Sequence, residues 1–86
     1  MKAKATEVCS VVEEFNFDDD TWDAICLARL RYVTTPNKRD WYHALRLYCG
    51  YTGGNYAMMH TVGSAADAWL QAHPTWVQRR HDTKEI

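Results

Sequence analysis

The chain has 86 residues, a formal net charge of −1 and 24% charged residues. This length makes one domain, and because so small a chain buries only roughly 60% of its unfolded surface, its core must be dense in large side chains. Four Trp, five Tyr and two Phe can supply such a core, so the composition excludes a disordered chain. No apolar run approaches the ~18–20 residues of a membrane span, and we expect one soluble domain over 1–86, with residues 1–5 and 78–86 flexible.

The three cysteines indicate a cytoplasmic protein. Cys9, Cys26 and Cys49 are odd in number, form no Cys-x-x-Cys pair and follow no secretory apolar segment, a combination typical of reduced thiols. Each falls at a position that looks apolar in the patterns below. We therefore expect them to be inert core residues.

The N-terminal segment predicts a short helix near 6–15. Val8, Val11, Val12 and Phe15 have the i, i+3, i+4, i+7 spacing of one helical face. The β-branched run within this segment leaves a short strand as the alternative, although a lone strand would have no evident partner.

The aspartates at 18–20 predict the start of a helix over 20–33. An Asp at the N-cap accepts hydrogen bonds from the unpaired backbone N–H groups, and further acids suit the positive end of the helix dipole. The run lacks the alternating ligands and the glycine of a calcium loop. Arg29 intrudes into the apolar side of this helix, where it either snorkels to solvent or pairs with a carboxylate such as Glu14 or Asp40.

Two further helices are expected, over 36–49 and 56–73. For the first, Thr35 is the expected N-cap, Pro36 the first helical residue and Gly50 the C-terminal stop. Pro74 ends the second, and the small residues around Gly63 predict the close approach of another helix backbone, with a kink as the alternative. Residues 75–86 read as a polar tail with one more short turn at most.

These elements predict an all-α single-domain bundle of three main helices preceded by a short N-terminal helix, with antiparallel neighbours because the loops are short. The expected core consists of Val12, Phe15, Trp22, Ile25, Cys26, Leu30, Trp41, Leu45, Tyr48, Met58, Val62, Ala65 and Trp69.

No motif predicts catalysis, a metal or a cofactor. His60, Ser64 and Asp67 have the residue types of a hydrolytic triad, but at i, i+4, i+7 they project side by side from one helix face, which we expect to be solvated. The histidines and cysteines lack the close spacing of zinc ligands. We therefore expect a protein that is not an enzyme.

Charge is unevenly distributed along the chain. Residues 1–23 hold two lysines against seven acids, whereas 29–66 hold five Lys and Arg against Asp40 alone. Either the two parts neutralise each other within the fold, or the basic middle serves an acidic partner.

The segment 38–51 is the most informative part of the sequence. It is apolar or aromatic around most of a helix, and its remaining edge is basic, because Arg39, His43 and Arg46 follow an i, i+4, i+7 spacing beside Tyr42, with Tyr51 nearby. Trp, Tyr and Arg dominate the energetics of protein interfaces. We predict that Arg39, Tyr42, His43, Arg46 and Tyr51 bind a partner.

The partner expected from this surface is another protein, which makes the chain a small binding module such as an adaptor or an inhibitor that occludes a larger protein. The alternative is nucleic-acid or nucleotide binding by the basic-aromatic helix 38–51, whose cations would contact phosphates while its aromatics stack on bases. Self-association is a further expectation, since so many aromatics are hard to bury. In general appearance the chain is similar to small helical proteins of phages and other mobile elements, without a residue motif that carries the likeness.

Overall fold

The computed structural model describes the backbone of residues 2–85 and the side chains of residues 8–85. The described chain forms five helices and contains no strand. They are α1 (Lys2–Phe15), α2 (Asp19–Thr34), α3 (Arg39–Cys49), α4 (Tyr56–Ala72) and α5 (Pro74–Asp82). The all-α prediction is confirmed, although the helix count is five. In the part of the chain that is described, no helix is long and apolar enough to cross a membrane.

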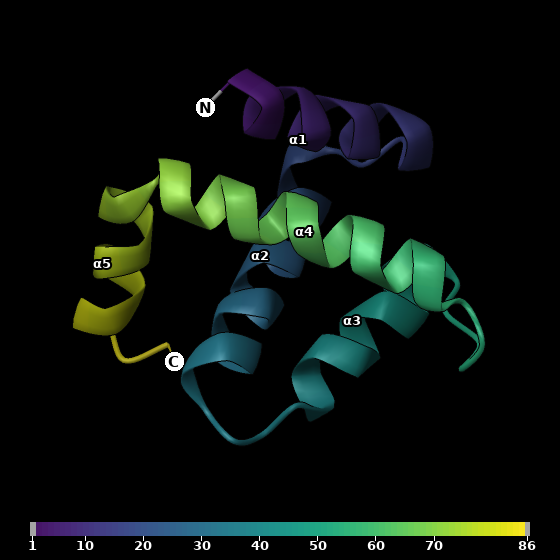
Figure 1. Cartoon of the computed structure of the whole chain (residues 1–86). Coiled ribbons are helices and arrows are strands. Elements are labelled where there is room, and N and C mark those ends of the chain that lie inside the picture. Colours follow the sequence, from purple (N-terminus) through teal and green to yellow (C-terminus); the bar gives the residue numbers. More distant parts are fainter. Residues whose placement is uncertain (1, 86) are drawn as a thin grey trace.

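Helix α4 is the central element of the arrangement. It packs against α1, α2 and α5, while α2 and α3 form an antiparallel pair joined by the short loop at 35–38. Figure 1 shows α4 lying across the α2–α3 pair, with α1 along one side of it and α5 turning back from its C-terminal end. The flexibility expected of residues 1–5 and 78–86 stays a prediction.

The helical reading of the N-terminal segment is confirmed, and the strand alternative is wrong. Val11 is only 1% exposed in the core, and Val8, Val12 and Phe15 are half-buried beside it. The helix ends at Asn16, whose φ of 56° is left-handed, and the Phe17 N–H donates to the Val12 carbonyl over 3.1 Å. This is the usual way in which a helix C-terminus satisfies its last carbonyl groups.

The predicted cap of α2 is also confirmed. Asp18 Oδ1 accepts a hydrogen bond from the Thr21 N–H over 2.8 Å, and Asp19 and Asp20 occupy the first turn. The hydrogen bonds from Thr21 stabilise the charged carboxylate and therefore lower the pKa of Asp18.

The predicted start of α3 is wrong, whereas its predicted end is right. Thr35 closes α2 instead of capping α3, because its hydroxyl and its N–H both donate to the Arg31 carbonyl, over 2.7 and 3.0 Å. Asn37 Oδ1 accepts from the Arg39 N–H over 2.9 Å, so α3 begins three residues later than predicted. Gly50 ends it with a left-handed φ of 69°.

Residues after α4 do more than form a polar tail. Pro74 occupies the first turn of the nine-residue helix α5, where its missing N–H is not needed. The Trp76 ring packs edge-on against Trp69 with 5.0 Å between centroids, and His73 stacks on the Trp69 ring at 3.9 Å. The sequence prediction of at most one short turn was therefore too short.

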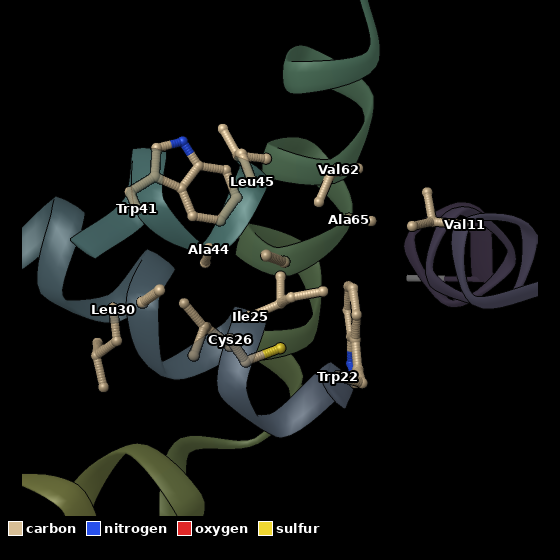
Figure 2. Packing of buried hydrophobic residues seen from close by; sticks show 13 residues of the cluster. Val11, Trp22, Ile25, Cys26, Leu30, Trp41, Ala44, Leu45, Val62 and Ala65 are labelled. Atoms are coloured by element: carbon tan, nitrogen blue, oxygen red, sulfur yellow. The ribbon is translucent and has the colours of Figure 1, made fainter. Parts of the chain in front are cut away.

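The core lies where α2, α3 and α4 meet (Figure 2). Of the predicted core, Val12, Phe15, Met58 and Trp69 are only half-buried, and Tyr48 is 37% exposed. Tyr48 is outside because α3 packs inward through Trp41, Ala44 and Leu45, and Tyr48 lies one turn beyond them. The buried apolar side chains are those of Val11, Trp22, Ile25, Cys26, Ala28, Leu30, Trp41, Ala44, Leu45, Val62, Ala65, Ala66, Ala68 and Leu70.

Two leucines of α3 allow a matched test of this packing. Leu45 is fully buried, whereas Leu47 is 61% exposed. Leu45→Ala should lower the free energy of unfolding by about 2–5 kcal/mol because it leaves a cavity, and Leu47→Ala should change it by less than about 0.5 kcal/mol. Urea unfolding of both variants measures the difference, and equal losses would show that α3 is rotated from the orientation described.

Candidate functional site

Arg29 and Asp67 form a two-pronged ion pair between α2 and α4. Arg29 Nε donates to Asp67 Oδ1 over 2.8 Å and Nη2 donates to Oδ2 over 2.9 Å, with the two side chains 17% and 39% exposed. The carboxylate raises the pKa of Arg29. Arg29 thus neither snorkels nor pairs with Glu14 or Asp40, and the predicted partners are wrong because sequence proximity gave no hint of a carboxylate 38 residues away.

The rest of the Arg29 environment is aromatic and tightly fitted. Its Cζ lies 4.6 Å from the centroid of the Tyr32 ring and 4.9 Å from that of Trp41, distances typical of cation–π contacts. A Cβ atom at Gly63 would lie 3.2 Å from the same Cζ. Gly63 is therefore a close-approach position as predicted, but what approaches is a side chain and α4 continues through it without a break.

The residues with the chemistry of a triad are not assembled as one. His60 and Ser64 are exposed, as predicted for a solvated face. Asp67 departs from that prediction because it is half-buried and paired with Arg29. Within residues 8–85 no hydrogen bond joins it to His60 or Ser64. His60 and Ser64 instead line a small pocket of about 100 Å³ beside Arg29, Tyr32 and Gly63. No group of three or more His, Cys, Asp or Glu among the described side chains could hold a metal ion.

Four of the predicted partner-binding residues lie on α3, and the fifth, Tyr51, lies in the loop that follows it. Arg39, His43 and Arg46 are exposed, as expected when Trp41, Ala44 and Leu45 turn the opposite face inward. Tyr42 and Tyr51 are half-buried, and their rings lie 6.0 Å apart at an angle of 39°. We call these five residues the basic edge.

Several cations of the basic middle are already engaged within the fold. Arg29 pairs with Asp67, Arg31 lies 3.5 Å from Asp40 and donates to the Glu85 carbonyl, and the Lys38 ammonium lies 4.2 Å from the centroid of the Tyr32 ring.

The two remaining arginines of the middle are different. In residues 8–85 the side chains of Arg39 and Arg46 make no ion pair or hydrogen bond. The N-terminal acids do not neutralise the described cations, because the ion-pair partners of Arg29 and Arg31 come from α4 and α3. The unengaged positive charge of the middle is concentrated on the basic edge.

The sequence analysis missed a groove beside the basic edge. Leu47 belongs neither to the predicted core nor to the predicted binding residues, and it is 61% exposed. It follows His43 by one turn, so the i, i+4 spacing was the signal that could have placed it outside. The groove has a volume of about 230 Å³, and we call it the α2–α3 groove. It is lined by Ala24, Leu27, Ala28, Arg31, Asp40, His43, Ala44, Leu47 and Tyr48.

Comparison of the chain with protein-family models, with curated proteins and with solved structures finds no match. The functional argument therefore depends on the geometry of this chain alone.

The three thiols should differ in reactivity, since Cys9 is exposed, Cys49 half-buried and Cys26 buried. The expectation that all three are core residues is wrong for Cys9. Helix α1 packs through Val8, Val11 and Val12, and Cys9 lies on the other side of the helix. Burial raises the pKa of Cys26 and raises that of Cys49 to about 11.

We therefore expect iodoacetamide at pH 8 to modify Cys9 first, Cys49 far more slowly, and Cys26 only after unfolding. Because the thiolate is the nucleophile, the rate at Cys49 should rise about tenfold per pH unit until its pKa of about 11. Mass spectrometry of the peptides measures each rate. Equal and rapid labelling of all three thiols in the folded protein would contradict these burial assignments.

Gly63 should resist a substitution that usually stabilises helices. Gly→Ala in a helix interior gains about 1 kcal/mol, but here the new Cβ would press on a guanidinium that Asp67 and two rings hold in place. We expect no gain from Gly63→Ala in the natural chain and a gain of about 1 kcal/mol in an Arg29→Leu background. Urea unfolding of the natural chain, the two single variants and the double variant measures this double-mutant cycle. The same gain in both backgrounds would disprove the steric conflict.

Proposed function

We propose that this protein is a non-enzymatic binding module that attaches to another protein through the basic edge. The observation that carries the proposal is the pair of exposed, unengaged arginines, Arg39 and Arg46, on the outer face of α3 beside the Tyr42–Tyr51 pair. Every other Arg or Lys of residues 29–66 has a partner inside the fold. The chemistry of the edge suits an acidic protein surface.

The aromatic part of the edge favours binding at low entropic cost. Tyr42 and Tyr51 are half-buried and rest against each other, so each presents its exposed part in a fixed position. Preorganised aromatic side chains lose little conformational freedom when a partner docks, and Tyr and Arg are among the residues that contribute most to binding energy. A module of this kind acts as an adaptor or as an inhibitor that occludes its partner.

Nucleic-acid binding has less support from the same geometry. Two unengaged arginines would neutralise about two phosphates, and the slope of log affinity against log salt is roughly −0.9 per phosphate. Such a site would bind nucleic acid weakly. A protein partner and a nucleic-acid partner can therefore be told apart by whether the complex survives nuclease treatment.

The test is affinity capture from a cell lysate, with and without nuclease, using the natural chain and two matched charge reversals. Arg46→Glu changes the basic edge, and Arg79→Glu makes the same change on the exposed side of α5. We expect a nuclease-resistant protein partner whose affinity falls about tenfold or more with Arg46→Glu and is unchanged with Arg79→Glu. Equal retention by both variants would refute the basic edge, and loss of the complex on nuclease treatment would replace a protein partner with nucleic acid.

A further inference from the structure

The small pocket beside Arg29 contains a buried donor that the fold leaves without an acceptor. Trp41 lines this pocket and is 1% exposed. Its indole N–H has no hydrogen-bond partner among the described residues, yet it is not sealed off as the N–H of Trp22 is. Figure 2 shows the Trp41 nitrogen on the edge of its ring that faces away from Ala44 and Ile25. A buried polar group without a partner is costly, so we ask what could fill this space, which we call the Trp41 pocket.

Arg29 supplies a second donor to the Trp41 pocket. Its Nε and Nη2 donate to Asp67, which does not line the pocket, and this pair does not use Nη1. A Cβ atom at Gly63 would lie 3.2 Å from Nη1. The missing side chain of Gly63, which lines the same pocket, therefore leaves space in front of this donor.

The exposed polar side chains of the pocket are donors as well. His60 and Ser64 line it and are exposed to solvent. Neither side chain makes a hydrogen bond within residues 8–85, and each can donate one to a ligand. None of the described residues that line the pocket is a carboxylate. Such a set of donors suits a ligand that brings acceptor atoms and negative charge, because hydrogen bonds to an ionised acceptor are the strong ones.

Size and charge narrow this ligand to a carboxylate. The volume of the pocket, about 100 Å³, is roughly that of three water molecules and well below the roughly 300–1,000 Å³ of sites for larger ligands. The cations of Arg29 and Lys38 lie 4.6 and 4.2 Å from the centroid of the Tyr32 ring, which lines the pocket. Asp67 offsets one of the two charges. One positive charge is left, and a small monoanion balances it.

From this geometry we infer that the Trp41 pocket binds a carboxylate group, either of a free carboxylate ion or of an acidic side chain on a bound protein. One carboxylate oxygen accepts from the Trp41 N–H and the other from Arg29 Nη1, while Ser64 donates from the exposed side. The guanidinium carbon of Arg29 lies 4.9 Å from the centroid of the Trp41 ring, so the fold holds both donors in place before the ligand arrives. Preorganised donors lose little conformational freedom on binding.

An acetate titration of the ¹⁵N-labelled full chain, followed by NMR, tests the inference. The chain has four indole N–H groups, and the signal of Trp41 is identified by its loss in Trp41→Phe. We expect this signal to move downfield and to saturate, with a dissociation constant on the order of 10 mM because so small a ligand makes few contacts. The signal of Trp22, whose N–H is enclosed, should not move.

Sodium chloride at equal ionic strength is the control for this titration. A Trp41 signal that does not saturate with acetate, or that moves equally with chloride, would overturn the inference. Tighter binding of inorganic phosphate than of acetate would show that the ligand is not a carboxylate.

Two variants of the pocket and one matched control locate the binding site. Gly63→Ala places a methyl group in front of Arg29 Nη1 and should weaken acetate binding at least tenfold. Ser64→Ala removes an exposed donor and should weaken it about two- to tenfold. Ser10→Ala makes the same change on the exposed side of α1 and should have no effect. Unchanged acetate binding by Gly63→Ala, with an unchanged circular dichroism spectrum, would refute this pocket as the site.

The capture experiment decides where the carboxylate comes from, and this arm alone rests on the proposed function. If an acidic side chain of the bound protein fills the pocket, Gly63→Ala should weaken capture and acetate should compete with the partner. If the ligand is a free carboxylate ion, neither should change capture. The acetate titration needs no partner and Arg46 does not line the pocket, so either proposal can fail without the other.

Discussion

The ion pair between Arg29 and Asp67 is the constraint on which the rest of the structure depends. It lies where α2, α3 and α4 meet, since the guanidinium contacts Asp67 on α4 and the ring of Trp41 on α3. A partly buried charge is costly to leave without its partner, so the loss of either member destabilises more than the pair itself contributes. The position of the guanidinium excludes a side chain at Gly63 and so sets how closely α2 and α4 approach.

The same contact determines which face of α3 is exposed. Trp41 is 1% exposed and packs on Arg29 and on the Tyr32 ring, 6.0 Å away. With Trp41 fixed inward, the 100° step per residue sends Arg39, Arg46 and Leu47 outward. The exposed surface of α3 is therefore a consequence of the buried interaction. Substitutions near Arg29 should alter the positions of the side chains on the opposite side of α3.

Sequence reasoning succeeded for local features, namely the caps and helix faces that are determined by residues nearby in the chain. The cap at Asp18, the left-handed Gly50 and the apolar face of α1 all follow from residues within one or two turns. It failed where tertiary contacts or competing local bonds decide. Thr35 could either cap α3 or close α2, and its hydroxyl donates to the Arg31 carbonyl at the end of α2. The partner of Arg29 is 38 residues away. The basic edge was predicted because helical periodicity alone brings its α3 residues together. The exposure of Leu47 was not predicted, because apolar character alone does not say whether a side chain lies inside.

The position of Arg39 shows that stability alone does not account for the charges on α3. Arg39 is the first residue of this helix, where the positive end of the helix dipole disfavours a cation by about 0.3–1 kcal/mol. Arg46, in the last turn, suits the dipole, and Asp19 and Asp20 suit the start of α2. Arg39 is the exposed cation of this surface that has no ion pair and an unfavourable place in its own helix. Under the proposed function, an acidic group of the bound protein would supply the negative charge that the monomer does not place beside Arg39.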